Sequence, residues 1–231
     1  MKKVLVSWSG GLDSTYLIQR YLLDGYEVHA VNNIIHNNAS KAIMELNAIH
    51  KLIPKLEKLG TFKYLDKLCK IDVNNNNPKY KGLIGQSAIW LYSMCFFDFT
   101  GYDHIALGYL ACELEVSYLE DINNLAQSLQ SFMVGSFPPI QFPLKKIRKI
   151  SIYELILSEL LEDVTHCEMS IYDESKGVKV CQKCLKCSNV KGILKTYKDF
   201  LTECKKYDIL KNNTRSKWIK VSKEALDSYG S

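Results

Sequence analysis

The sequence predicts an α/β protein whose first part is a Rossmann-like parallel sheet and whose last part is a small, cysteine-containing helical region. Short apolar runs alternate with longer helical stretches up to about residue 160, which is typical of a parallel sheet. A glycine turn separates the first apolar run from the first helical stretch. Closely spaced cysteines, followed by many lysines, mark a different region near the end.

The first 31 residues are expected to form a β-α-β unit. Residues 3–8 contain an apolar run of strand length, and a pair of glycines ends it. Residues 14–23 carry apolar side chains at helical spacing, and Gly25 is a plausible helix stop. Residues 26–31 read as the second strand. So short a unit favours a parallel strand pair with a right-handed crossover.

The alternation continues along the chain. The predicted order is helix, strand, helix, strand, helix, short extended segment and helix, over residues 39–59, 68–73, 85–99, 104–107, 117–134, 140–144 and 151–161. Pro54 is expected to kink the first of these helices. The asparagine run at 74–77 predicts a loop. We therefore expect one domain over residues 1–164 and a second region over 165–231.

Composition excludes several classes of protein. Of the 231 residues, 47% are apolar and 24% charged, which argues against disorder, collagen and coiled coil. The sequence has no run of 18 apolar residues, so we expect no membrane span, and the glycine turn comes too early for a signal peptide. We expect a cytoplasmic protein, in which eight cysteines indicate metal ligands or free thiols rather than disulfides.

Positive charge is concentrated late in the chain. Residues 176–223 hold 14 Lys and Arg against three Asp and Glu, although the whole chain has a net charge of only +5. Such asymmetry indicates either a nucleic-acid or phosphate partner or a solvated lysine-rich helical tail. The tail is the preferred interpretation, because Arg215 is the one arginine among these cations and no RNA-binding motif accompanies them.

The glycine turn, residues 9–15, reads Ser-Gly-Gly-Leu-Asp-Ser-Thr and lies where an open α/β sheet binds ligands. Its glycines let backbone N–H groups approach an anion, its hydroxyls add donors, and the helix start adds partial positive charge. Asp13 is expected either to shape the turn or to help hold Mg²⁺. The turn lacks the lysine of a kinase-type P-loop, which favours pyrophosphate. The plain alternative is a strand-to-helix turn capped by Ser14.

Four cysteines have the spacing of a metal site. The pattern C-x13-C-x2-C-x2-C predicts a closed tetrahedral site for structural Zn²⁺, with an iron–sulfur cluster as the second choice and unrelated free thiols as the plain alternative. Nearby lysines would offset the thiolate charge. His166 either replaces one ligand or is a bystander. The predicted metal ligands are Cys167, Cys181, Cys184 and Cys187.

Ser-Gly-Gly-x-Asp-Ser after a first strand resembles the signature of the PP-loop ATP pyrophosphatases. Together with the four cysteines, it resembles the 7-cyano-7-deazaguanine synthases of queuosine biosynthesis over most of the chain. Gly85-Gln86-Ser87, Gly108-Tyr109, the segment 117–121 and Pro143-Leu144 followed by Lys149 fit the outline of that family. The departures are Gln86 for an arginine, Leu110 for an asparagine, Leu119 for a proline, and a longer insert between the first two cysteines.

The resemblance implies an adenine nucleotide alpha hydrolase-like fold and an ATP-dependent carbon–nitrogen ligase. The implied enzyme adenylates 7-carboxy-7-deazaguanine and uses ammonia to form the amide and then the nitrile, with release of AMP and pyrophosphate. It also implies ATP, Mg²⁺ and Zn²⁺ as cofactors, and a possible homodimer. Two alternatives stay open: a PP-loop enzyme that modifies a tRNA, DNA or protein acceptor, and a non-enzymatic nucleotide-binding zinc protein.

Each predicted role falls on particular residues. The catalytic candidates are Ser9, Asp13, Ser14 and Lys149, although Lys149 is also compatible with a solvated lysine. The substrate candidates are Tyr118, Glu120 and Asp121, whose plain alternative is a surface position. The candidates for ATP binding are Trp8, Ser9, Gly10, Gly11, Leu12, Asp13, Ser14, Thr15, Asn32, Gly85 and Gly108.

Overall fold

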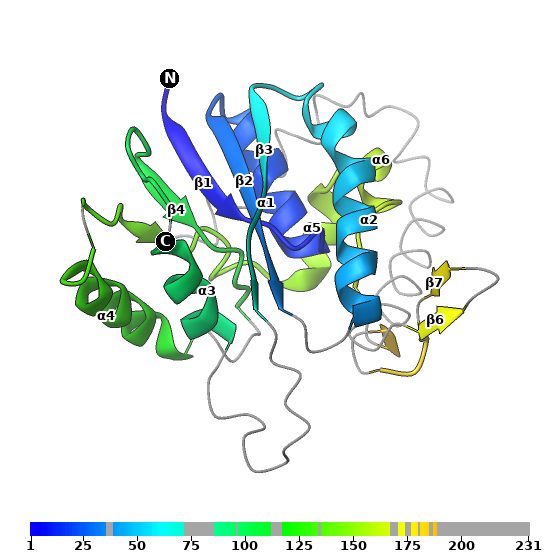
Figure 1. The fold of residues 1–231 in the computed structure, drawn as a ribbon. Coiled ribbons are helices and arrows are strands. Elements are labelled where there is room, and N and C mark those ends of the chain that lie inside the picture. Colours follow the sequence, from blue (N-terminus) through cyan, green and yellow to red (C-terminus); the bar gives the residue numbers. More distant parts are fainter. Residues whose placement is uncertain are drawn as a thin grey trace, which may run out of the picture.

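The computed structural model describes residues 1–35, 39–71, 86–95, 97–111, 117–133, 135–166, 171–173, 177–179, 181–184 and 187–188. Helices and strands follow one another along these residues (Figure 1). Their bounds are β1 (Lys3–Ser7), α1 (Leu12–Leu23), β2 (Glu27–Ile35), α2 (Ala39–Leu56), β3 (Phe62–Ile71), α3 (Gln86–Met94), β4 (His104–Ala106), α4 (Leu119–Gln130), β5 (Ile140–Gln141), α5 (Lys149–Leu155), α6 (Ser158–Leu161), β6 (Ile171–Asp173) and β7 (Gly177–Lys179).

Five parallel strands form the central sheet, in the order β3-β2-β1-β4-β5. This confirms the predicted α/β class with a parallel sheet. The strand order reverses at β1, which pairs with β2 on one side and β4 on the other. The carboxyl ends of β1 and β4 therefore mark the switch point of the sheet, and this is where open α/β sheets bind ligands.

Helices cover both faces of the sheet (Figure 1). Val4 and Val6 of β1 belong to a core formed with α1, α2, α5 and α6. Leu5, which points to the opposite face, belongs to a second core formed with α3 and α4. Because β1 is buried on both faces, its side chains are a continuous apolar run rather than an alternating one.

The third strand is longer than predicted. The expected strand over residues 68–73 begins instead at Phe62, which pairs with Val28 of β2. Phe62 and Tyr64 pack edge-on against Trp8. This tertiary contact explains why the residues before 68 also belong to the strand. The predicted asparagine loop lies outside the described residues.

The predicted helix over residues 151–161 is two helices, α5 and α6. The backbone at Ile156, between the two helices, is extended. The buried side chain of Gln19 in α1 hydrogen-bonds to the backbone on either side of Ile156. The Gln19 amide donates to the Leu155 carbonyl at 3.0 Å, and the Leu157 N–H donates to Gln19 Oε1 at 2.8 Å. A buried side chain from a distant helix therefore stabilises an interruption that the local periodicity does not indicate.

The second region was predicted to be helical, but its described part contains the antiparallel hairpin of β6 and β7. Among the described residues after 165, only residues 187–188 are helical. Residues 189–231, on which the rest of that prediction falls, lie outside the described residues. The boundary at 165 stays a prediction. Within the described part of the chain, no helix has both the length and the apolar character needed to cross a membrane.

Stability should depend on the contact between α1 and the sheet. Leu17 is 0% exposed, whereas Leu23 on the same helix is 55% exposed. We expect Leu17→Ala to lower the free energy of unfolding by about 2–5 kcal/mol, because it leaves a cavity in the core. The matched variant Leu23→Ala should lower it by less than about 0.5 kcal/mol. Urea unfolding of both variants checks this, and equal losses would contradict the packing described here.

Candidate functional site

The glycine turn lies at the carboxyl end of β1, where the strand order reverses. The Trp8 N–H donates to the Val31 carbonyl at 2.8 Å, which carries the pairing of β1 and β2 one residue past the strand. Helix α1 then begins, with Gly11 as an extended N-cap and no side-chain cap from the part of the chain that the structure describes. The first N–H groups of α1 have no partner within the helix, and together with the helix dipole they favour an anion.

Gly10 fits the turn against α2. Its φ angle is +70°, and a Cβ atom there would lie 2.9 Å from the Glu45 carbonyl oxygen and 3.2 Å from Ala48 Cβ. The space beside the Gly10 Cα is filled by α2, so packing requires a glycine there. The approach of an anion to the backbone N–H groups of the two glycines stays a prediction.

Two hydroxyls of the turn are only loosely bonded. Ser9 Oγ and Ser14 Oγ lie 3.5 Å apart, and the Ser14 hydroxyl lies 3.4 Å from the Gly11 carbonyl oxygen. The Gly11 N–H reaches Ser9 Oγ at a similar 3.4 Å. Hydroxyl hydrogen bonds are normally about 2.7–2.8 Å long, so these contacts are weak. Both side chains keep most of their capacity to donate to a bound anion.

The side chains of Trp8, Leu12 and Thr15 belong to the interior of the protein. Thr15 is fully buried, and its hydroxyl accepts the Trp8 indole N–H at 2.9 Å. The Thr15 hydroxyl is therefore engaged as an acceptor inside the protein, and its donation to an anion stays a prediction. For Trp8 and Leu12, only backbone atoms remain for contact with a ligand.

Asp13 and Lys149 form an ion pair at the turn. Lys149 Nζ lies 3.0 Å from Asp13 Oδ2, and the side chains are 26% and 20% exposed. The second oxygen, Asp13 Oδ1, is buried and accepts no hydrogen bond from the described residues. A carboxylate oxygen in that state fits a Mg²⁺ ligand, since this ion prefers carboxylate and phosphate oxygens. Lys149 keeps the charge of Asp13 from repelling an anion.

Two side chains near this ion pair have shifted pKa values. Burial, followed by the negative charge of Asp13, raises the pKa of Tyr153 to about 12, so its hydroxyl stays protonated at neutral pH. Burial, followed by the positive charge of Lys149, lowers the pKa of His166, which favours the neutral imidazole. The sequence analysis missed Tyr153. The available signal was its position four residues after Lys149 on one helix.

The remaining nucleotide candidates lie around the turn. A Cβ at Gly108 would lie 3.4 Å from the Ser14 backbone nitrogen, so glycine lets the end of β4 pack against the start of α1. Asn32 is buried, and its amide donates to the Trp8 carbonyl at 2.8 Å. Asn32 Oδ1 accepts no hydrogen bond from the described residues, so its capacity as an acceptor is unused by them. Gly85 lies outside the described residues.

The predicted substrate residues lie at the start of α4. Glu120 and Asp121 are exposed in the first turn of α4, and Tyr118 packs partly buried against the core on that face. No hydrogen bond or ion pair within the described ranges connects Glu120 or Asp121 to residues 9–15. The structure brings together the turn, Gly108, Asn32 and Lys149, but not the two acidic residues.

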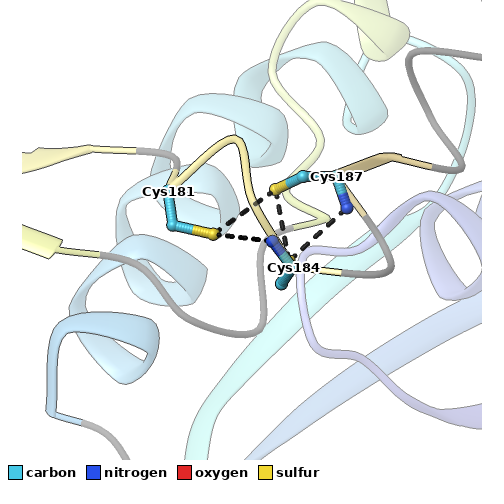
Figure 2. A group of neighbouring side chains, drawn as sticks. All are labelled: Cys181, Cys184 and Cys187. Atoms are coloured by element: carbon cyan, nitrogen blue, oxygen red, sulfur yellow. Dashed lines mark hydrogen bonds between the residues drawn. The ribbon is translucent and has the colours of Figure 1, made fainter.

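The cysteine cluster consists of Cys181, Cys184 and Cys187, whose sulfur atoms point toward one another (Figure 2). Cys184 Sγ lies 3.3 Å and Cys181 Sγ 3.9 Å from Cys187 Sγ. Four thiolates at about 2.3 Å from a tetrahedral Zn²⁺ would be roughly 3.8 Å apart. The 3.9 Å separation matches that value, and the 3.3 Å separation is about 0.5 Å shorter, so Cys184 and Cys187 would have to move apart slightly to hold the ion. The predicted fourth ligand, Cys167, lies outside the described residues.

Backbone N–H groups also favour the thiolate form of the cysteine cluster. The Cys184 N–H donates to Cys181 Sγ at 3.3 Å, and the Cys187 N–H donates to Cys184 Sγ at 3.4 Å. The Lys183 N–H reaches Cys181 Sγ at 3.4 Å. Hydrogen bonds of this kind stabilise negative charge on sulfur, which a metal ligand needs. These three residues could therefore hold a metal ion.

Thr165 bonds directly to the glycine turn, which the sequence analysis did not anticipate. Its N–H donates to the Gly10 carbonyl at 2.9 Å, and a single parallel bridge pairs it with Gly11. No sequence signal marks this contact, because the partners are far apart along the chain and the bond is made by backbone atoms. The first residue of the predicted second region therefore contacts the candidate nucleotide-binding turn directly.

Comparison of this chain with models of known protein families finds no match, and neither does comparison with curated proteins. The function proposed below therefore depends on the geometry of the turn, on the cysteine cluster and on the resemblance of the sequence motifs.

The fit of Gly10 between β1 and α2 predicts a large effect of one methyl group. Gly25 also has a positive φ, but a Cβ there meets no atom within 4 Å. We expect Gly25→Ala to destabilise the protein by about 1–2 kcal/mol through backbone strain alone. Gly10→Ala should cost about 1–3 kcal/mol more, because it also overpacks the contact with α2. Comparison of the urea midpoints of the two variants measures the difference. Equal shifts of the midpoint would mean that α2 moves to make room for the methyl group at little cost.

Proposed function

We propose that the chain binds ATP with its phosphates at the glycine turn and transfers the AMP unit to a carboxylate oxygen. The observation that supports this proposal is that several hydrogen-bond donors and a lysine lie together at the turn. Uncapped N–H groups of α1 and the loosely bonded Ser9 and Ser14 hydroxyls lie at the switch point of the sheet. Lys149 stands 3.0 Å from Asp13 at the same place. Pyrophosphate is a leaving group that needs such donors.

The proposed substrate is 7-carboxy-7-deazaguanine, with ammonia as the nitrogen donor. This finer step comes from the resemblance to the 7-cyano-7-deazaguanine synthases, which is carried by the turn motif and the cysteine spacing. In the first activation, a carboxylate oxygen attacks the α-phosphorus and pyrophosphate leaves. Ammonia then attacks the acyl carbon, AMP departs with that oxygen, one proton is lost, and an amide results.

The nitrile requires a second ATP in this proposal. The amide oxygen attacks the α-phosphorus of that ATP, and pyrophosphate again leaves. Loss of AMP removes the oxygen, and loss of the two remaining N–H protons gives the carbon–nitrogen triple bond. Both activations create negative charge on the leaving pyrophosphate. Preorganised donors at the turn would stabilise that charge, so no side-chain nucleophile is required.

Bound Mg²⁺ would supply charge neutralisation between phosphate oxygens, with Asp13 as its protein ligand. Asp13 suits this role because one of its oxygens is buried and accepts no bond from the described residues. Lys149 would orient the other oxygen and contribute a fixed positive charge. In the same proposal the cysteine cluster holds structural Zn²⁺, because closed thiolate sites leave no position for a substrate.

The proposal predicts AMP formation that depends on Lys149. Wild-type protein given ATP, Mg²⁺, ammonium and 7-carboxy-7-deazaguanine should release AMP, which mass spectrometry detects with the amide or nitrile. Lys149→Met should lower kcat/KM by about 10²–10³-fold, because it removes a fixed charge from the phosphate site. Lys145→Met, in an exposed position of the same segment, should change it by less than about twofold, since exposed charges are screened.

Several outcomes would overturn the ligase assignment. If Lys145→Met and Lys149→Met lose activity equally, the turn is not the phosphate site. ATP binding without AMP formation, whatever acceptor is supplied, would instead identify a non-enzymatic nucleotide-binding protein. Thermal unfolding of both variants serves as the control, because a partly exposed ion pair contributes only about 1 kcal/mol or less to stability.

One observation favours a second candidate, in which the adenylated acceptor is a tRNA. Lys145, Lys146 and Arg148 are exposed and form no ion pair with the described residues. They precede Lys149, so this basic segment lies at the rim of the proposed phosphate site. A cluster of unpaired cations beside a catalytic site suits a polyanionic substrate.

Salt dependence tests the tRNA candidate. We expect tRNA affinity to fall steeply with salt, and the slope of log K against log[salt] to shrink by about 2 in the Lys145→Glu/Lys146→Glu variant. Lys58→Glu/Lys63→Glu is the matched control, because both lysines are exposed and Lys63 lies near the amino end of β3. The absence of any tRNA shift at low salt, or an equal effect of both variants, would exclude this candidate.

A further inference from the structure

Helix α5 brings two side chains of one face to the glycine turn. Lys149 and Tyr153 are about one helical turn apart, so they lie on the same face of α5, and α5 packs against α1. Lys149 Nζ lies 3.0 Å from Asp13 Oδ2, in the first turn of α1. Because the side chain of a helical residue leans toward the amino end of its helix, Tyr153 is directed toward Lys149 and the start of α1.

The pKa of Tyr153 supports the same placement. Burial, followed by the negative charge of Asp13, raises this pKa to about 12. The phenol is therefore close enough to the Asp13 carboxylate to experience its charge. It also keeps its proton at neutral pH, so the hydroxyl can donate a hydrogen bond to an anion.

The Tyr153 hydroxyl has no hydrogen-bond partner among the described residues. The residue is only 4% exposed, and its ring packs in the core that α1, α2, α5 and α6 form with the sheet. The hydroxyl oxygen is nevertheless not enclosed, unlike Asp13 Oδ1, which is buried and accepts no bond from the described residues. Buried tyrosine hydroxyls normally find a partner, and phenylalanine would fill the same space without needing one. A ligand at the turn would explain why this position holds a tyrosine.

The surroundings of this hydroxyl favour an anion. Lys149 supplies a positive charge, and the first N–H groups of α1 have no partner within their helix. A phosphate oxygen accepts hydrogen bonds from donors of this kind, and its negative charge strengthens each of them. The hydroxyl therefore suits a phosphate oxygen better than a neutral group.

We propose that Tyr153 is a further binding residue of the proposed ATP site, whose hydroxyl donates a hydrogen bond to a phosphate oxygen. Helix α5 then supplies a fixed charge through Lys149 and a neutral donor through Tyr153, while α1 supplies backbone N–H groups. Because the glycine turn is the proposed pyrophosphate site, the hydroxyl acts on the part of ATP that leaves, and it favours ATP and pyrophosphate over AMP. The inference rests on the proposed function, because it names how that site retains its nucleotide.

Binding of inorganic pyrophosphate tests the contact directly. Isothermal titration, with Mg²⁺ present and no acceptor, compares the wild type with Tyr153→Phe, which removes only the hydroxyl. We expect Tyr153→Phe to bind pyrophosphate and ATP about tenfold more weakly, because hydrogen bonds to charged groups are among the stronger ones. Its affinity for AMP should change by less than about twofold, since AMP lacks the two phosphates that the hydroxyl contacts.

Tyr26→Phe is the matched control. Tyr26 packs against the same core, but it comes directly before β2 and so lies at the amino ends of the strands, away from the turn. Tyr26→Phe should change the affinities for pyrophosphate, ATP and AMP by less than about twofold. An equal loss of pyrophosphate affinity in the two variants, or an equal loss of AMP and pyrophosphate affinity in Tyr153→Phe, would overturn the proposal.

Thermal unfolding separates this role from a structural one. Without ligand, the midpoint of Tyr153→Phe should stay within about 2 °C of the wild type, because the hydroxyl that it removes has no partner to lose. The same concentration of pyrophosphate should raise the midpoint of the wild type more than that of Tyr153→Phe, since stabilisation by a ligand follows its affinity. A large loss of stability without ligand, with equal shifts on adding pyrophosphate, would assign Tyr153 to packing alone.

A double variant distinguishes direct contact from an effect through Lys149. In the Lys149→Met background, Tyr153→Phe should still weaken pyrophosphate binding by at least about threefold, because the two side chains contact the phosphates separately. No further loss in the double variant would mean that the hydroxyl only positions the lysine, and the direct contact would be wrong.

These measurements also separate the role of Tyr153 from the proposed function. A wild type that binds pyrophosphate more tightly than Tyr153→Phe but releases no AMP would overturn the ligase assignment and leave the role of Tyr153 intact. A wild type that forms AMP, with equal kcat/KM and equal pyrophosphate affinity in Tyr153→Phe, would overturn the role of Tyr153 alone. Failure of the wild type to bind either ATP or pyrophosphate would overturn both.

Discussion

The close approach of α2 to Gly10 is the constraint on which the candidate site depends. A Cβ at this position would lie 2.9 Å from a backbone carbonyl, and the φ angle of +70° also favours glycine. Because Gly10 fits, the chain can turn tightly after β1 and begin α1 two residues after Gly10. The start of α1 then lies against Gly108 at the end of β4. The first N–H groups of α1 thus lie at the switch point between β1 and β4.

At the glycine turn, the negative charge of Asp13 is balanced by the positive charge of Lys149. An acidic side chain in an anion site would repel the anion, and Lys149 at 3.0 Å offsets that repulsion. The pair is partly exposed, so it contributes little to stability. Its position is better explained by chemistry: one oxygen is engaged by the lysine, and the buried one accepts no bond from the described residues. Carboxylate, lysine and helix start lie together at the turn, which is why we expect Lys149 to matter more to the proposed ATP site than its exposed neighbours.

The cysteine cluster and the glycine turn both contact α2, although they lie far apart in the sequence. The spacing Cys-x2-Cys-x2-Cys is enough to bring three sulfur atoms together, because each two-residue step folds a backbone N–H onto the preceding sulfur. The contacts with α2 have a different origin. Met44 packs against the cysteine cluster, and the carbonyl of the next residue, Glu45, lies beside Gly10.

Sequence alone determined the features whose signals lie within a few residues: the buried run of β1, the glycine turn, α1 with its stop at Gly25, and the cysteine triad. Only the tertiary structure decided that Lys149 meets Asp13, residues 136 apart in sequence, and that Thr165 supports the turn. It also decided that Gln19 interrupts the predicted last helix and that Thr15 is buried against Trp8. The physical reason is that propensity and spacing act locally, whereas these contacts exist only after the helices have packed on the sheet.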